Sequence, residues 1–164
     1  MTVVQDPARA LLIGIGANVV LDIWLLALRL LGVPTLDFAL LGRWFGHLLR
    51  GQVAHAAIAR AQPIHRELAL GWFAHYATGI AFAAVLVGLQ GPDWSRQPTL
   101  APALGFGLLT VLAPLLLLQP AMGAGLASRR TATPLKNVLR SLANHAVFGL
   151  GLYLSSLLAA LALP

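Results

Sequence analysis

The sequence predicts an all-α membrane protein with four transmembrane helices and one interfacial amphipathic helix. Three observations lead to this fold class. First, 59% of the 164 residues are hydrophobic and only 10% are charged, whereas soluble domains carry about 25% charged residues. Second, the apolar residues form long runs of about 20 residues, the length that crosses the roughly 30 Å hydrocarbon core of a bilayer. Third, the basic residues fall mainly between these runs.

Four spans account for the apolar runs, and we expect them to form a single membrane domain over residues 1–164. The segment QGPDWSRQP separates the second span from the third, and Gly91 and Pro92 within it are expected to break the helix. The segment ASRRTATPLKN separates the third span from the fourth. The predicted spans cover residues 11–31, 69–89, 100–121 and 139–161.

The link between the first and second spans contains a helix of a different kind. In the stretch LLGRWFGHLLR, Arg43, His47 and Arg50 recur at i, i+4 and i+7, so they share one helical face. Apolar residues occupy the other face, a pattern typical of a helix lying in the headgroup layer. Arginine is costly at the bilayer centre, so we do not expect this helix to cross. We therefore predict an interfacial cytoplasmic segment over residues 36–61, with a re-entrant segment as the alternative.

The basic residues also predict the orientation of the spans. An even number of spans places both termini on one side of the membrane, and only Arg9 and Arg96 fall on that side. By the positive-inside rule, the side richer in basic residues is cytoplasmic. We expect a bacterial inner-membrane protein with both termini in the periplasm, and the net charge of +6 then reflects topology and not nucleic-acid binding. The basic residues of the cytoplasmic side are Arg43, Arg50, Arg60, Arg66, Arg129, Arg130, Lys136 and Arg140.

Each span places a strong polar group in the cytoplasmic half of the bilayer. His75 and His145 each lie six residues into their spans, about 9 Å from the boundary. Asp22 lies about 14 Å deep, and Gln119 lies near the end of the third span. A charged carboxylate in hydrocarbon costs a few kcal/mol, so Asp22 is expected to face the bundle interior, to be paired or to be protonated, and His75 and His145 are its obvious partners. We predict that these four residues form a substrate-binding or ion-binding site.

Other interpretations of the same residues stay open. His75 and His145 each precede a glycine by four residues, in HYATGIAF and HAVFGLGL. This short repeat suggests two related helical hairpins, and it would allow both histidines to act as axial ligands of a b-type haem. Alternatively, the polar groups are structural, because polar pairs fix which helix faces meet. A divalent metal bound by Asp22 and the histidines is disfavoured because the sequence lacks a tight ligand spacing, so we expect neither a metal nor, in the first instance, any cofactor.

Catalysis of the kind found in soluble enzymes has little support, and we expect no catalytic residue. Cysteine is absent, only five acidic residues are present, and no serine-nucleophile, phosphate-loop or zinc-protease motif occurs. The glycine-rich stretch GAGLAS follows a membrane span and is expected to end it. Nearby basic residues are candidates for contacts with lipid headgroups. These are Arg43, Arg50, Arg129 and Arg130.

Four sequence blocks, occurring in order, are similar to a known bacterial family. They are LDIWLLALRLLGVPTLDFALLGRWFGHLLRG, ELALGWFAHYATGIAFA, PTLAPALGFGLLTVLAPLLLLQPAMGAGLASRRTATP and HAVFGLGLYL. Together, over residues 14–154, they resemble the family catalogued as domain of unknown function 2938. The resemblance implies a multi-span inner-membrane protein, and it implies no activity or ligand.

The working hypothesis from the sequence is a small transporter or channel-like protein whose polar site lies within the membrane. A haem-binding electron-transfer subunit is one alternative. A structural or assembly partner of a larger membrane complex is the other. A bundle of four spans has little room for a translocation path, so we expect a homo-oligomer or a larger complex in the lipid bilayer.

Overall fold

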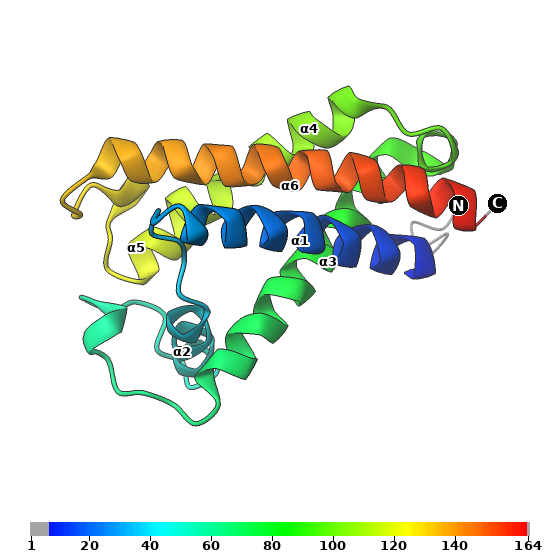
Figure 1. The fold of residues 1–164 in the computed structure, drawn as a ribbon. Helices are drawn as coiled ribbons and strands as arrows, with labels where there is room; N and C mark the ends of the chain where they lie inside the picture. Colours follow the sequence, from blue (N-terminus) through cyan, green and yellow to red (C-terminus); the bar gives the residue numbers. More distant parts are fainter. Residues whose placement is uncertain (1–6, 164) are drawn as a thin grey trace. The chain divides into compact units, whose positions relative to one another are not determined.

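Four helices in the structure are long and apolar enough to cross a membrane, which confirms the predicted fold class. The computed structural model describes residues 7–163, and these contain helices and loops but no strand. Figure 1 shows the helices in chain order. The four candidate spans are Pro7–Leu30, Glu67–Arg96, Leu100–Ala121 and Pro134–Ala162.

Six α-helices, two 3-10 turns and one π-helix make up the described chain. The π-helix, η2, covers Ala113–Leu118, and the 3-10 turns are η1 (Ile58–Arg60) and η3 (Leu126–Ser128). The α-helices are α1 (Pro7–Leu30), α2 (Phe38–Leu48), α3 (Glu67–Arg96), α4 (Leu100–Leu109), α5 (Gln119–Ala121) and α6 (Pro134–Ala162).

The second span is interrupted where the sequence predicts a break. Gly91 within α3 has φ 81° and ψ 175°, a conformation outside the helical region, and Pro92 follows it. Glycine reaches positive φ without the steric cost that a β-carbon brings. The last residues of α3, up to Arg96, therefore form a separate short helix after a kink.

The third span is less regular than the sequence indicates. It consists of α4, η2 and α5 in succession, whereas the apolar run predicts one continuous helix. Pro114 lies in η2 and Pro120 lies in α5, and each proline lacks the backbone N–H that a regular helix would use. Widening into a π-helix is the way in which the chain accommodates this pattern. Extended π-helices are rare and often occur at functional sites.

The described residues divide into two compact units. The first unit contains the chain up to Val33, Tyr76–Thr110 and the chain from Asn144 onwards. The second unit contains Pro34–His75 and Val111–Ala143. We describe each unit separately.

Glycines bring the helices of the first unit into backbone contact. A β-carbon at Gly14 of α1 would lie 2.4 Å from Cα of Ile80 in α3, and one at Gly107 of α4 would lie 2.4 Å from Cα of Gly149 in α6. Close approach through small residues is the common packing mode of membrane helices. Figure 1 shows the C-terminal part of α6 running alongside α1, where Gly151 contacts Ala17. The buried core of this unit is formed by Ile13, Ala17, Ala83, Leu86, Trp94, Ala103, Phe148, Leu152 and Ala159.

A buried arginine joins three helix ends of the first unit. Arg9, at the start of α1, is 5% exposed. Its guanidinium donates to the carbonyl oxygen of Ser95 at 2.7 Å and to the carbonyl oxygen of Leu163. Carbonyls at helix C-termini lack helical partners and carry partial negative charge, which a cation stabilises. The start of α1 and the ends of α3 and α6 therefore lie together, as an even number of spans requires.

In the second unit, α2 crosses the start of α3 at two glycines. A β-carbon at Gly42 would lie 1.7 Å from the carbonyl oxygen of Glu67, and one at Gly71 would lie 1.8 Å from that of Phe38. Asp37 caps α2 by accepting a hydrogen bond from the Ala39 N–H at 2.8 Å. The helix that the sequence predicts between the first two spans is therefore present, as Phe38–Leu48.

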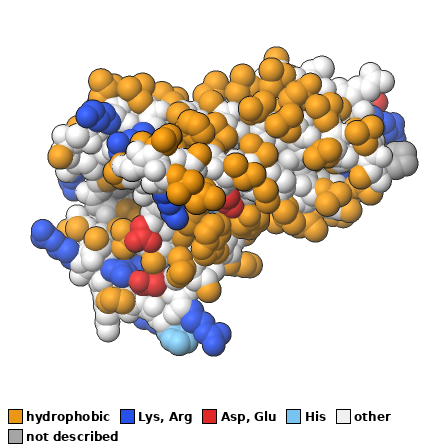
Figure 2. Space-filling view, in the orientation of Figure 1, with side chains coloured by type: hydrophobic (Ala, Val, Ile, Leu, Met, Phe, Trp, Pro, Cys, Tyr) orange, Lys and Arg blue, Asp and Glu red, His pale blue; other side chains and the backbone are white. Residues whose placement is uncertain are grey.

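Most of the apolar surface of the spans is left uncovered by the protein. Between 28% and 39% of the most apolar window of each span is buried. Figure 2 shows hydrophobic side chains covering most of the surface over α1, and Ile23 and Leu26 of that helix are 63% and 57% exposed. Soluble monomers rarely expose contiguous apolar patches of this extent, so this surface is suited to lipid.

Candidate functional site

Polar side chains of the first unit gather at one level of its helices. Three sets of contacts fix the register between them. On α1 and α3, Asn18 contacts Gly79 and Asp22 contacts Tyr76. On α1 and α6, Ala17 contacts Gly151 and Trp24 contacts Asn144. On α4 and α6, Gly107 contacts Gly149 and Thr110 contacts His145. We call Asp22, Trp24, Tyr76, Thr110, Asn144 and His145 the polar level.

Asp22 is held at this level by a tyrosine of the neighbouring helix. The Tyr76 hydroxyl donates to Oδ2 of Asp22 at 2.8 Å, and both side chains are partly buried. An O–H···O⁻ hydrogen bond to a carboxylate is among the stronger ones in proteins. The prediction that Asp22 faces other helices therefore holds, and Tyr76 is one of its partners.

His145 has a defined tautomer because of its hydrogen bonds. The hydroxyl of Thr110 donates to the carbonyl oxygen of Gly107 at 2.6 Å, so its proton is already used. With that proton on Gly107, the contact of 2.8 Å between Thr110 Oγ1 and His145 Nδ1 is a donation from Nδ1–H. In the neutral ring, Nε2 keeps its lone pair. This atom can accept a proton or bind a metal.

A tryptophan and an asparagine complete the polar level. The indole N–H of Trp24 donates to Oδ1 of Asn144 at 2.9 Å, which links α1 to α6. Asn18, about one turn before Asp22 on α1, is 1% exposed and lies against Gly79. Each helix of the first unit thus contributes a polar side chain that meets another helix.

The other two predicted site residues belong to the second unit. The ring of His75 packs against Phe38, with centroids 4.9 Å apart, and against the edge of Trp72 at 5.9 Å. Gln119 accepts a hydrogen bond from the Ser128 hydroxyl at 2.9 Å and donates to Ser141 at 3.4 Å. Within its units, the structure places Asp22 and His145 at one level of the first unit, and it places His75 and Gln119 in the second unit.

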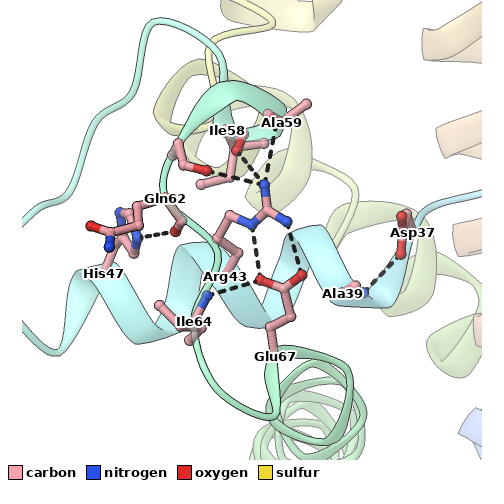
Figure 3. Close-up of polar contacts among 10 residues, drawn as sticks. Asp37, Ala39, Arg43, His47, Ile58, Ala59, Gln62, Ile64 and Glu67 are labelled. Carbon is pink, nitrogen blue, oxygen red and sulfur yellow. Dashed lines mark hydrogen bonds and ion pairs between the residues drawn. The ribbon is translucent and has the colours of Figure 1, made fainter.

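Arg43 of α2 forms the densest polar cluster of the second unit, shown in Figure 3. Its Nε and Nη2 atoms donate to the two carboxylate oxygens of Glu67 at 2.9 and 2.8 Å. Its Nη1 donates to the carbonyl oxygens of Ile58, Ala59 and Ala61 at 3.2 to 3.4 Å. The hydrogen bond to Glu67 raises the pKa of Arg43 above its ordinary value. Arg43 therefore fastens the link between α2 and α3 to both helices.

This geometry gives Arg43 a different place from the one that the sequence analysis expects. Arg43 is only 9% exposed and is engaged by protein groups, so a role in contacting lipid headgroups does not fit its surroundings. The helical period correctly groups Arg43 with His47 on one face, and the structure shows both side chains bonded to the chain between α2 and α3. The three other candidates for headgroup contact, Arg50, Arg129 and Arg130, are exposed.

No metal centre is formed by the part of the chain that the structure describes. Over residues 7–163, no three His, Asp or Glu side chains lie close enough together to hold an ion. Stable protein sites for zinc take three or four such ligands.

Sequence reasoning missed Tyr76 and Glu67. Tyr76 directly follows His75 in HYATG, and a tyrosine in an apolar span is a polar group that needs a partner. Glu67 stands at the predicted start of the second span, where an acidic residue is expected to complement the helix dipole. Its partner Arg43 is 24 residues earlier in the chain, so no short sequence motif predicts this ion pair.

Comparison with known proteins places the chain in a family. A model of the family described as protein of unknown function, DUF2938, matches residues 11–159. The chain belongs to this family. The membership confirms the resemblance of the sequence blocks and covers all four candidate spans. Neither the curated proteins nor the solved structures gave a significant match.

Proposed function

We propose that this member of DUF2938 is a small transport protein of the bacterial inner membrane, and that the polar level of its first unit binds the proton that drives transport. The observation that carries the proposal is the hydrogen-bond chain from His145 Nδ1–H through the Thr110 hydroxyl to the Gly107 carbonyl. This chain fixes the ring so that Nε2 is the proton acceptor. An imidazole can take up and release a proton at such a ring nitrogen.

Asp22 supplies the second protonatable group of the level. Ionisable residues inside membrane segments are rare, and they commonly mark proton relays and ion pathways. Tyr76 donates to the carboxylate, so a hydrogen bond stabilises the charged form of Asp22. A proton that binds to Asp22 neutralises its carboxylate, and a proton that binds to His145 gives its ring a positive charge. Either change in charge can drive the conformational change of a proton-coupled transporter.

The interruption of the third span supports the same proposal. Discontinuous helices carry the ion and substrate sites of many secondary transporters, and the C-terminal ends of half-helices favour cations. Here α4 ends at Leu109, and Thr110 follows as its C-cap. The partial negative charge at this helix end lies beside the His145 ring, because Thr110 contacts that ring.

The remaining parts of the proposal concern the surroundings of the protein. The asymmetry of basic residues favours the bacterial inner membrane with both termini in the periplasm. A homo-oligomer or a larger membrane complex would supply the walls of a path that four spans alone cannot enclose. We keep His75 and Gln119 as further candidates for contacts with a transported molecule.

A pH jump on a solid-supported membrane tests proton binding without a known substrate. The wild-type protein is expected to give a transient capacitive current when the pH falls, because protons enter the membrane-spanning part. Asp22→Asn and His145→Gln should each remove a large part of this current. Thr78→Val is the matched control, because Thr78 is exposed on α3, and it should behave as wild type. Currents no larger than those of protein-free membranes would contradict the proposal.

A structural role is the second candidate, and the tyrosine contact of Asp22 favours it. Polar contacts such as Asp22 with Tyr76 and Trp24 with Asn144 are worth about 0.6 kcal/mol each on average in membrane proteins, and they fix helix pairing. In this case Asp22→Asn, which keeps an acceptor for the tyrosine, leaves the pH-jump current unchanged and raises the unfolding temperature. The haem alternative makes its own prediction, a Soret absorption band that is lost in His75→Ala or His145→Ala.

A further inference from the structure

Two histidines hold the link between α2 and α3 in place within the second unit. Nδ1 of His47, on α2, lies 2.8 Å from Nε2 of His55 in the link. The ring centroids are 4.9 Å apart, with 47° between the planes. Nε2 of His47 lies 3.0 Å from the carbonyl oxygen of Gln62, further along the same link, a contact drawn in Figure 3. His47 is 7% exposed.

These contacts determine where the protons of the neutral pair are. A carbonyl oxygen can only accept, so His47 Nε2 must carry a hydrogen and donate it to Gln62. In a neutral ring, Nδ1 of His47 is then an acceptor. The short contact between the two rings is therefore a donation from His55 Nε2–H to His47 Nδ1. The neutral pair has one vacant nitrogen left, which is Nδ1 of His55.

The vacant nitrogen has no place for a proton in the folded arrangement. Nδ1 of His55 is buried and has no hydrogen-bond partner in the described part of the chain. A proton added there would create a buried cation with an unsatisfied N–H, which is costlier than a buried lone pair. Transfer of the shared proton from His55 Nε2 to His47 Nδ1 would move the positive charge to His47. The new N–H at His55 Nδ1 would still have no acceptor. Protonation of the pair therefore favours a state in which His55 has turned to water.

The charged groups around the pair do not change this conclusion. Arg43 lies one turn before His47 on α2, and its charge is matched by Glu67 of α3 in a two-point ion pair. The backbone of His55 donates to the carbonyl oxygen of Ala121 in α5, and that helix, Gln119–Ala121, carries no titratable side chain. Glu67 also acts on His47 electrostatically, but both of its carboxylate oxygens are already engaged by Arg43. No hydrogen bond joins Glu67 to the His55 ring, whose Nδ1 has no partner in the described part of the chain.

We propose that the His47–His55 pair is a proton-operated latch. At neutral pH the pair fastens the segment around His55 to α2, and on acidification one proton enters at His55 Nδ1, the contact with His47 breaks, and the link loosens locally around His55. Trp44 gives the link a second attachment that does not titrate, since its indole N–H donates to the carbonyl oxygen of Val53 at 2.8 Å. The latch therefore loosens the chain locally and leaves the fold intact.

Hydrogen–deuterium exchange of the full-length protein in lipid nanodiscs tests the latch. Protection of residues 49–62, corrected for the pH dependence of intrinsic exchange, is measured between about pH 8 and pH 5, the range in which imidazoles gain a proton. In the wild type we expect protection to fall about tenfold, which corresponds to about 1.4 kcal/mol. In His55→Gln, the amide can donate to neutral His47 or accept from its protonated form, so protection should stay nearly constant. The control His65→Gln changes an exposed histidine of the same link and should keep the wild-type response.

Nuclear magnetic resonance provides a readout that does not depend on the variants. The ¹⁵N spectrum of the wild-type histidine rings should show His47 protonated at Nε2 and His55 protonated at Nε2 at about pH 8. A His47 tautomer with its proton on Nδ1 would overturn the proposal. Protection that is independent of pH in the wild type, or an equal fall in His55→Gln, would overturn it as well.

Discussion

Gly107 of α4 and Gly149 of α6 are in backbone contact, because a β-carbon at Gly107 would lie 2.4 Å from Cα of Gly149. The contact stands next to the hydrogen-bond chain of His145 and Thr110, and it brings the two helices close enough for that chain to form. Gly14 of α1 makes the equivalent approach to α3, at Ile80. Gly16, two residues after Gly14, also approaches a neighbouring helix, at Ser155 of α6.

Gly107→Ala should destabilise the first unit, because the added methyl group meets backbone that cannot turn away. Overpacking of this kind costs about 1 to 3 kcal/mol. Gly105→Ala is the matched control in the same helix, since no atom lies within 4 Å of a β-carbon at Gly105. That variant should be neutral or slightly stabilising, because alanine is the better helix former. Thermal unfolding in detergent measures both, and equal unfolding temperatures for the two variants would contradict the packing.

Thr110→Val should release the His145 ring from its fixed tautomer. The substitution keeps the shape of the side chain but removes the acceptor for Nδ1–H, at a cost of about 1 kcal/mol. The ¹⁵N spectrum should change from a ring protonated at Nδ1 to a mixture of tautomers. Thr110→Ser keeps the hydroxyl and should restore the wild-type spectrum. An unchanged tautomer in Thr110→Val would mean that the hydrogen bond to Thr110 does not determine the protonation of the ring.

Much of the fold could be predicted because it follows from local sequence. Apolar length fixes the four spans, and the spacing of Arg43 and His47 fixes α2. The sequence does not say what each helical face meets, because a basic face is equally suited to phosphate headgroups and to buried carbonyls. Only the partner decides, and Glu67 is distant along the chain. The broken third span was missed for a related reason: Pro114 and Pro120 stand in a run whose hydropathy is that of a continuous helix.

The same limit applies to the candidate site. The cost of leaving Asp22 in hydrocarbon correctly predicts that it meets another polar side chain. It does not select the partner, because a tyrosine hydroxyl and an imidazole both satisfy a carboxylate. Tyr76 and His75 are consecutive residues of α3, about 100° apart around the helix. A prediction from depth alone does not distinguish two neighbours at the same level, so it did not point to Tyr76.

Arg43→Ala should destabilise the second unit by about 3 kcal/mol, because it leaves the largely buried carboxylate of Glu67 without its cation. The side chains of the pair are only 11% and 19% exposed, so water screens the loss weakly. Arg43→Lys should recover only part of the stability, because an ammonium group cannot make the two-point contact. Arg50→Ala is the control on the same predicted face, exposed and expected to stay within about 0.5 kcal/mol. Limited proteolysis of residues 49–66 provides the measurement, and equal cleavage rates in Arg43→Ala and Arg50→Ala would argue against the cluster.

The absence of cysteine from the chain allows a direct test of orientation. Single cysteines at Arg129 and at Arg96, both exposed, probe the two predicted sides against a background without native thiols. Arg96→Cys should react with a membrane-impermeant maleimide in intact spheroplasts, because its loop is expected in the periplasm. Arg129→Cys should react only after the inner membrane is opened, because its loop carries the excess of basic residues that stays in the cytoplasm. The reverse pattern would invert the topology, and it would place the His47–His55 pair on the periplasmic side.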